Sequence, residues 1–280
     1  MMELLFQRMD TYTLANKIEE EYAIREIVQE IVLYALFRGG FFKVAAFQGG
    51  TSLRIVHGMQ RFSEDLDFIL QKPTPSFVWK PYLDSVIEVL EEYGLHCEVA
   101  DLSKEDNNVK KAMVKDSSIL ELFELSFYDD SRPKKVKIKL EVDINPPTGS
   151  CLSHSFLDFP LDYEICCQDL PSNFALKIHA LLCRGYLKGR DWFDFNWYIK
   201  QEVVPNLQLL QSALMQNGPW EKQKITVTND WLKQAMQDKI SSIDWDYARG
   251  DIEKFLSKTQ QESLALWGEQ FFLSKVNSLK

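Results

Sequence analysis

The sequence predicts an α+β protein in which a mixed β-sheet core with flanking helices is followed by a C-terminal helical bundle. Strand-like and helix-like patterns alternate up to about residue 168, whereas only helical patterns follow from about residue 170. The 280 residues are 45% hydrophobic and 12% aromatic, so the chain can bury two ordinary cores. We therefore expect one domain over residues 1–168 and a helical domain over residues 169–280.

The first predicted element is a helix over residues 20–38. Its apolar residues Ile24, Ile27, Val28 and Ile31 recur at helical spacing, and the glycine pair at 39–40 ends it. Further elements follow in order: a strand over 41–47, one or two helical turns over 51–57, a strand over 65–70, a helix over 77–93 and a strand around 95–101.

The residue pattern in the middle of the chain predicts a β-hairpin. The polar segment 103–117 is expected to be a loop or lid. Residues 119–128 and 135–145 alternate between apolar and polar side chains, and the intervening "DDSRPK" is typical of a turn. A last strand is expected over 161–166. The C-terminal half then predicts six helices, over 172–187, 190–201, 206–216, 229–241, 245–257 and 260–277.

Charge and composition exclude several classes of protein. The net charge of −9 argues against a general nucleic-acid coat protein, although residues 132–139 and 177–190 are locally basic. The five cysteines include no CxxC pair, which argues against a disulfide framework and a structural zinc site. The sequence shows neither a membrane-spanning apolar run nor a signal peptide, so we expect a cytoplasmic protein without membrane contact.

The stretch "AFQGGTSLRIVHGMQRFSEDLDFIL" at residues 46–70 contains several candidate functional residues. Carboxylates at Asp65 and Asp67 project from one face of a strand, where they repel each other unless a cation lies between them. Glycines let a backbone approach a phosphate closely, and the following helix start offers unpaired N–H groups. The Ser52 hydroxyl could donate to the same phosphate. A solvated strand edge is the alternative, but the combination favours a site for Mg²⁺ or Mn²⁺ and phosphate.

Three separated motifs resemble one known family. "GGTSLRIVHGMQRFSEDLDF", "KIKLEVDIN" and "NFALKIHALLCRGYLKGRDWFDFNWYIK" occur in the order found in the AbiEii/AbiGii toxin family of the DNA polymerase β-like nucleotidyltransferase superfamily. The resemblance spans about residues 40–200 and implies a nucleotidyltransferase-type sheet. The chain contains no GxxxxGK[ST] motif, which excludes a P-loop.

The resemblance implies roles for individual residues. The nucleotide-binding set is Gly49, Gly50, Thr51, Ser52, Lys177, Arg184 and Asp191, with Lys177 facing the triphosphate and Arg184 able instead to pair with Asp194. Asp65, Asp67 and Asp194 are the implied catalytic acids, and the first two bind metal. The third metal ligand is Glu141 or Asp143, which share one strand face; we favour Glu141 as both ligand and catalytic acid.

The implied reaction is transfer of NMP from an NTP, such as ATP or GTP, to an acceptor, which in related toxins is the tRNA 3′ end. A cognate antitoxin is the implied protein partner, and the helical domain is expected to complete the active-site cleft. The alternative is a nucleotide-binding module without turnover that acts through protein–protein contacts. A protein or small-molecule acceptor also stays open, because the acidic net charge fits poorly with a large RNA footprint.

Overall fold

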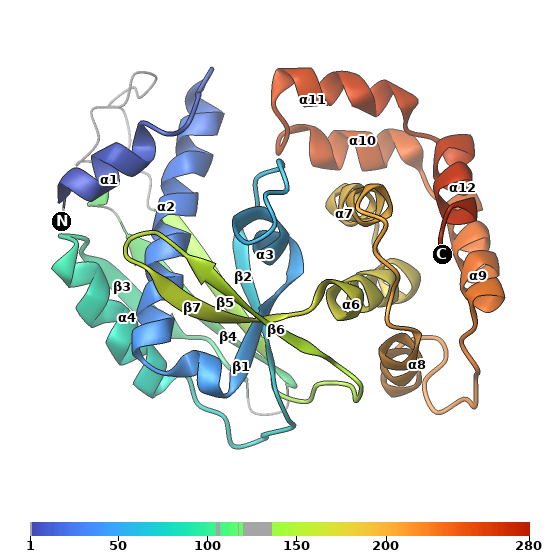
Figure 1. Ribbon diagram of the computed structural model, residues 1–280, viewed down its shortest axis with the longest axis horizontal. Helices are drawn as coiled ribbons and strands as arrows, with labels where there is room; N and C mark the ends of the chain where they lie inside the picture. The colour runs from blue at the N-terminus through green and yellow to red at the C-terminus, as the bar shows by residue number, and fades with distance from the viewer. Residues whose placement is uncertain (1, 105–106, 117, 120–135) are drawn as a thin grey trace. The chain divides into compact units, whose positions relative to one another are not determined.

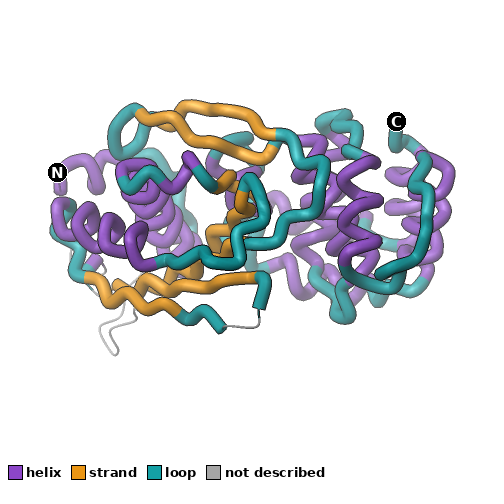
Figure 2. Tube along the Cα trace, turned by 90° about the horizontal axis from the view of Figure 1, so that it is seen from below, coloured by secondary structure: helices purple, strands orange, loops and turns teal. Residues whose placement is uncertain are grey.

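A computed structural model describes residues 2–104, 107–116, 118–119 and 136–280 of the chain (Figure 1). These residues divide into two compact units. The first comprises Met1–Gly58, Phe62–Pro146 and Ser153–Cys167, and the second Met59–Arg61, Pro147–Leu152 and Gln168–Lys280. Figure 2 shows the strands almost entirely in the first unit, whereas the second consists of helices and loops.

A seven-stranded mixed sheet forms the centre of the first unit, in the order β3-β4-β5-β2-β1-β7-β6. Its strands are β1 (Ala45–Gln48), β2 (Asp65–Leu70), β3 (Cys97–Asp101), β4 (Val109–Asp116), β5 (Val136–Asp143), β6 (Leu152–Leu157) and β7 (Tyr163–Gln168). Strand β2 pairs parallel with β5 and antiparallel with β1, and β1 pairs parallel with β7. Strand β2 therefore lies between β5 and β1 from Asp67 onward, and its first two residues pair with β5.

Helices pack on this sheet. They are α1 (Met2–Met9), α2 (Lys17–Arg38), the 3₁₀ turn η1 (Phe41–Lys43), α3 (Gly49–Ile55) and α4 (Lys80–Glu92). Helices α2 and α4 pack together, with α2 against β5 and α4 against β3. Strand β5 buries Ile138, Leu140 and Val142 completely, and the alternate positions of the strand form the more exposed, charged face.

The second unit is helical. Its elements are α6 (Leu170–Cys183), α7 (Gly189–Lys200), α8 (Leu207–Gln216), α9 (Asn229–Ser241), α10 (Trp245–Glu253), α11 (Lys258–Glu262), η2 (Ser263–Leu266) and α12 (Glu269–Asn277). Helix α6 packs on α7 and α8, and α7 packs on α10. The buried rings of Trp192, Phe195 and Phe272 belong to its core.

The predicted α+β class, with a mixed sheet followed by helices, is confirmed. The strand predicted over 65–70 has those bounds in β2, and α2 begins at residue 17, earlier than expected, because the Asn16 side chain accepts from the amides of Ile18 and Glu19. Residues 41–47 form a strand only from Ala45. The single helix predicted over 260–277 is wrong, since α11, η2 and α12 replace it.

The loop or lid predicted over 103–117 is also wrong, because Val109–Asp116 form β4 in the middle of the sheet. The edge strand β6 was not predicted. The predicted strand over 119–128 and turn over 129–134 lie, apart from residue 119, outside the described residues, as does the first half of the basic stretch 132–139. Among the described residues, no helix combines the length and apolar character needed to cross a membrane. All five cysteines are free thiols.

Candidate active site

Acidic and basic side chains meet on the charged face of β2 and β5. In the parallel register Asp65 lies beside Lys139, Asp67 beside Glu141, and Ile69 beside Asp143. Paired residues of adjacent strands point to the same face of a sheet, so Asp67 and Glu141 are direct neighbours there. Both are partly exposed. The register thus places Glu141, and not Asp143, next to the aspartate pair.

Gly49 brings the backbone of α3 against Asp67. Its φ of +78° lies in the left-handed region, which glycine adopts at little cost. A Cβ at this position would lie 2.7 Å from Oδ2 of Asp67, closer than real Cβ contacts. The preceding residue, Gln48, pairs with Asp67 across β1 and β2. The glycine pair and the Asp-x-Asp motif are therefore adjacent in space as well as in sequence.

The hydroxyl groups of Thr51 and Ser52 are buried and engaged by the protein. Thr51 Oγ1 donates to the Asp65 carbonyl and lies 2.8 Å from Ser63 Oγ. Ser52 Oγ donates to the Gly49 carbonyl at 2.9 Å. Thr51 thus fixes the start of β2, together with Ser63. Donation from Ser52 to a phosphate stays a prediction, and it requires the hydroxyl to turn away from Gly49.

Helix α2 supports the same strand start through residues that sequence reasoning missed. Gln29 is 1% exposed, and its Nε2 lies 3.2 Å from the Ser63 carbonyl and 2.9 Å from that of Glu64. Arg25 Nη1 forms an ion pair with Glu64 Oε1 at 2.9 Å. A glutamine within the apolar stripe of this helix was the available indication, since a buried amide needs hydrogen-bond partners.

Two lysines hold the side chain of Glu141. Its Oε1 lies 2.8 Å from Lys111 Nζ and 2.7 Å from Lys139 Nζ. Burial raises the pKa of this carboxyl, but the hydrogen bonds from the two ammonium groups outweigh burial and keep it below the ordinary value. Asp143 instead accepts from the Asn145 amide at 2.9 Å and so orders the chain after β5. Neither lysine was predicted to belong to the site.

The donor chemistry of this face suits a divalent metal, although its carboxylates are not gathered around one. Asp65, Asp67 and Glu141 offer hard oxygen ligands of the kind Mg²⁺ prefers, and the missing Cβ of Gly49 leaves space beside Asp67. No group of three His, Cys, Asp or Glu side chains in the described part of the chain is placed to hold an ion. The residues therefore fit a divalent metal in kind but are not gathered around one, and Glu141 is held by its two lysine partners.

The remaining predicted residues form an ion-pair cluster within the second unit. Lys177 Nζ lies 2.8 Å from Asp191 Oδ1 and 2.9 Å from Asp194 Oδ2. Arg61 pairs with Asp194 through two bonds of 2.6 and 2.7 Å, and Arg184 pairs with Asp191. The side chain of Lys177 is only 12% exposed. Arg61 neutralises the buried Asp194.

Burial and opposite charges determine the ionisation of this cluster. Burial raises the pKa of Asp191, but Lys177 and Arg184 more than offset it and bring that pKa to about 2. Asp194 also has a lowered pKa, because Arg61 and Lys177 outweigh its burial. Burial would lower the pKa of Lys177, yet the two aspartates raise it above the ordinary value. Lys177, Asp191 and Asp194 therefore stay charged near neutral pH.

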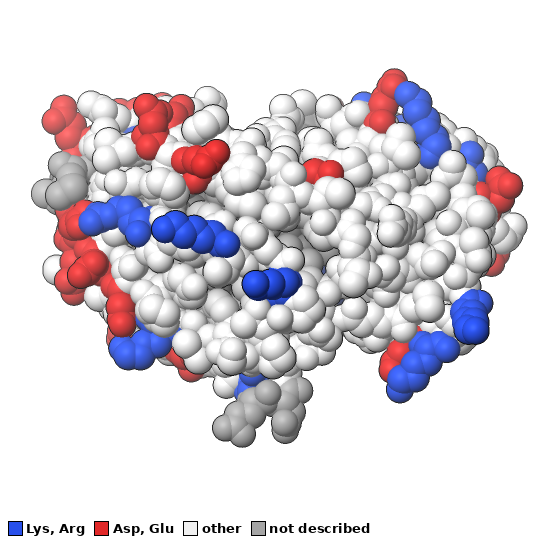
Figure 3. Space-filling model, turned by 60° about the horizontal axis from the view of Figure 1, so that its bottom comes forward, with Lys and Arg blue, Asp and Glu red and all other residues white. Residues whose placement is uncertain are grey.

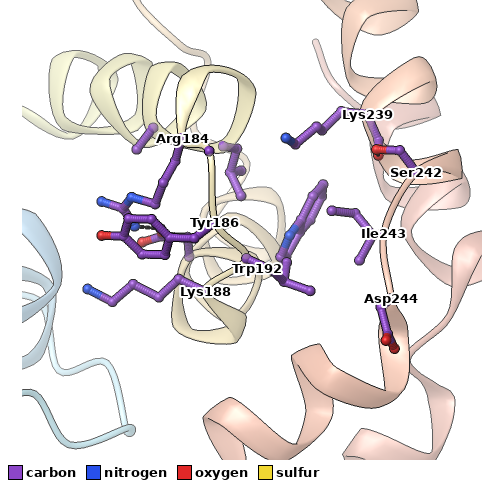
Figure 4. Close-up of a pocket in the computed structure, with 13 residues that line it drawn as sticks. Arg184, Tyr186, Lys188, Trp192, Lys239, Ser242, Ile243 and Asp244 are labelled. Carbon is purple, nitrogen blue, oxygen red and sulfur yellow. Dashed lines mark hydrogen bonds and ion pairs between the residues drawn. The ribbon is translucent and has the colours of Figure 1, made fainter.

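A cavity of about 250 Å³ lies beside this cluster within the second unit (Figure 4). Arg184 and Lys188 approach it together with the exposed ring of Tyr186, which stacks on the Arg184 guanidinium at 5.0 Å. Lys239 reaches it from α9. Burial, with the neighbouring cations, lowers the pKa of Lys188 despite the nearby Asp191. The cavity thus has three cationic side chains that could contact an anionic group, beside the carboxylates of Asp191 and Asp244.

Each set of predicted residues is gathered within its own unit. Gly49, Gly50, Thr51, Ser52, Asp65, Asp67, Glu141 and Asp143 belong to the first, and Lys177, Arg184, Asp191 and Asp194 to the second. The residues that pattern reasoning missed as part of the site are Gln29, Lys111 and Lys139.

Comparisons with known proteins identify a family and a similar fold. Residues 31–268 match the model of a family described as nucleotidyl transferase AbiEii toxin, Type IV TA system. The solved structure of JHP933 from Helicobacter pylori is similar at a TM-score of 0.52 and 16% identity, covering 95% of each chain. Another H. pylori structure, of a candidate nucleotidyltransferase, has a TM-score of 0.49 and 16% identity over 95% of this chain and 99% of its own. None of the curated proteins matches the sequence.

Proposed function

The chain belongs to the AbiEii nucleotidyl transferase toxin family, and on this premise we propose that it transfers NMP from an NTP to an acceptor in a Mg²⁺-dependent reaction. The observation that carries the proposal is the contact between Gly49 and Asp67, beside Glu141. It joins a backbone that can approach a phosphate to a row of carboxylates. These are the two parts that nucleotidyl transfer requires.

In this proposal Asp65 and Asp67 hold the metal and Glu141 completes the set. A bound Mg²⁺ would neutralise charge on the phosphates and orient them. The protein contributes mainly position. Thr51, Ser63 and the α2 side chains fix where β2 begins, and Gly49 keeps the space next to Asp67 open. Pyrophosphate is the leaving group.

Lys177, Arg184 and Asp191 are proposed to bind nucleotide on the strength of the resemblance, which implies that Asp194 is a catalytic acid. The ion pairs around Lys177 give this set a rigid arrangement, since each buried charge has a partner of opposite sign. The basic cavity beside Arg184 offers further cations for phosphate oxygens. Asp194, fully buried and bonded to Arg61, is better placed to position Lys177 than to touch substrate.

The acceptor is proposed to be the 3′ end of a tRNA. On the face shown in Figure 3, lysine and arginine side chains of the described residues form separate groups between uncharged atoms. Together with a net charge of −9, this pattern favours a local contact with one end of a nucleic acid over a broad electrostatic footprint. A cognate antitoxin is the proposed partner, in keeping with the Type IV TA system of the family.

Label transfer tests the proposal. The protein is incubated with each of the four α-³²P-labelled NTPs, purified tRNA and Mg²⁺, and parallel reactions contain EDTA or a total protein extract instead of RNA. The expected result is Mg²⁺-dependent label at the tRNA 3′ terminus, located by nuclease digestion. Label on a protein would support nucleotidyl transfer but would identify a protein, and not tRNA, as the acceptor. Nucleotide binding without transfer to any acceptor would contradict the proposal and favour the non-catalytic alternative.

A further inference from the structure

The carboxylate of Glu141, one of the three proposed metal ligands, is bound by two lysine ammonium groups. Both contacts, at 2.7 and 2.8 Å, are made to a single oxygen, Oε1. Lys139 comes from the same strand two residues earlier, and Lys111 lies directly opposite Glu141 in the antiparallel pairing of β4 with β5. The sheet register therefore brings two positive charges to one carboxylate.

Lys139 also interacts with the charges of the aspartate pair. Lys139 lies beside Asp65 in the register of β2 and β5. Burial would lower its pKa, but the hydrogen bond to Glu141 and the charges of Glu141, Asp65 and Asp67 raise it. Lys139 thus supplies, within this face, part of the positive charge that a divalent cation would supply.

Two ammonium groups on Oε1 repel a divalent cation that approaches the same carboxylate, because the positive charges then lie within a few ångströms of one another. Binding of the lysines to Glu141 therefore opposes binding of a metal there. The lysine side chains are 34% and 39% exposed, so both can turn away from Glu141 without crossing the core. Phosphate oxygens are suitable new partners for the released ammonium groups.

On the basis of the proposed function, we propose that Lys111 and Lys139 act as an exchangeable clamp on Glu141. Without nucleotide they occupy the carboxylate and weaken metal binding. When a metal–polyphosphate complex binds, Glu141 moves from the lysines to the metal, and the two lysines bind phosphate oxygens. The clamp makes binding of metal and polyphosphate mutually dependent, since each ligand favours the released state.

The clamp predicts effects of opposite sign from one substitution. Lys111→Met with Lys139→Met removes the competing cations, so the protein should bind Mn²⁺ alone about tenfold more tightly, within the usual range of coupling between sites. The same variant loses two phosphate contacts, so its affinity for magnesium tripolyphosphate should fall about tenfold. Tripolyphosphate is the probe because it carries three phosphates and no base. A lysine pair that only stabilised the sheet would change neither affinity in this way.

Mn²⁺ binding is measured by electron paramagnetic resonance of the free ion, and magnesium tripolyphosphate binding by calorimetry. Lys137→Met is the matched control. Lys137 is exposed on the same face of β5, but its neighbour on β4 is Lys115, and it is not one of the two lysines bound to Glu141. It should change each affinity by less than about twofold, a difference below 0.5 kcal/mol and typical of a surface position. Thermal melting shows that the variants remain folded.

Unchanged or weaker Mn²⁺ binding in the double lysine variant would overturn the clamp. An Asp65→Asn, Asp67→Asn variant separates this failure from failure of the proposed function. If that variant loses Mn²⁺ binding while the lysine variant matches the wild type, the metal site stands and the clamp is wrong. If it retains Mn²⁺ binding, the metal is not at this face and both proposals fail.

Discussion

Gly49→Ala should disable the metal face by displacing Asp67. An alanine here adopts a φ of +78°, which costs about 1–2 kcal/mol for a residue with a Cβ. Its Cβ would also lie 2.7 Å from Oδ2 and 3.0 Å from Cβ of Asp67, so the aspartate must move. Because a shifted support around a metal ligand typically costs about 10- to 100-fold in affinity, we expect at least a tenfold loss of Mn²⁺ affinity and of transfer activity.

Gly58→Ala separates backbone strain from the contact with Asp67. Gly58 has a similar φ of +68°, but nothing lies within 4 Å of its would-be Cβ. Both variants should lose about 1–2 kcal/mol of unfolding free energy in urea, whereas only Gly49→Ala should lose Mn²⁺ affinity. Equal Mn²⁺ affinities for Gly49→Ala and the wild type would refute the reasoning, because Asp67 would then bind no metal or would not need its position.

Three further predictions concern buried and acidic groups. Arg61→Met should reduce the unfolding free energy in urea by about 3–5 kcal/mol, because Asp194, which is 0% exposed, loses its two-bond partner. Glu141→Gln should reduce the transfer rate about 100-fold or more, and Asp143→Asn less than about tenfold, since only Glu141 lies beside the aspartate pair. Burial raises the pKa of Glu30 from 4.5 to about 7, so the folded state holds this proton more tightly than the unfolded state. The unfolding free energy should therefore fall by about 3 kcal/mol between pH 4.5 and 7, and Glu30→Gln should remove this loss in urea titrations across that range.

Each of these has a contrary outcome. Lys80→Met breaks an exposed ion pair and should cost less than about 0.5 kcal/mol; a similar small loss for Arg61→Met would show that Lys177 alone is a sufficient partner for the buried Asp194. A larger loss of activity for Asp143→Asn than for Glu141→Gln would show that Asp143, on the same strand face, is the third ligand instead. An unaltered pH profile in Glu30→Gln would mean that another group governs stability in that range.

Local patterns predicted β2 and β5 because their side chains alternate in the expected way. Apolar residues at 138, 140 and 142 are buried, and charged residues lie between them. Buried and more exposed positions also alternate in strand β4. The sequence does not show this pattern, since Lys110 occupies a buried position. Its ammonium group reaches the carbonyl of Lys104 at 2.7 Å, so a lysine takes a place that the pattern assigns to an apolar residue.

The site was predicted where its residues are close in sequence. Asp65, Asp67 and the glycine pair occur within twenty residues, and the strand period alone shows which side chains share a face. Sequence reasoning missed the pairing of Arg61 with Asp194, which are 133 positions apart, because no periodicity links them. The same limit applies to Lys111, whose place beside Glu141 depends on the register of two strands.

Transfer of α-labelled NTP by the Asp65→Asn, Asp67→Asn variant is the most direct test of the central claim. Substitution removes the charge that holds the metal and also relieves repulsion between the two carboxylates. The account predicts that Mg²⁺-dependent transfer falls to background while the melting temperature stays the same or rises. Full transfer activity in a folded double variant would contradict it, because the carboxylate face of β2 would then not be the catalytic site.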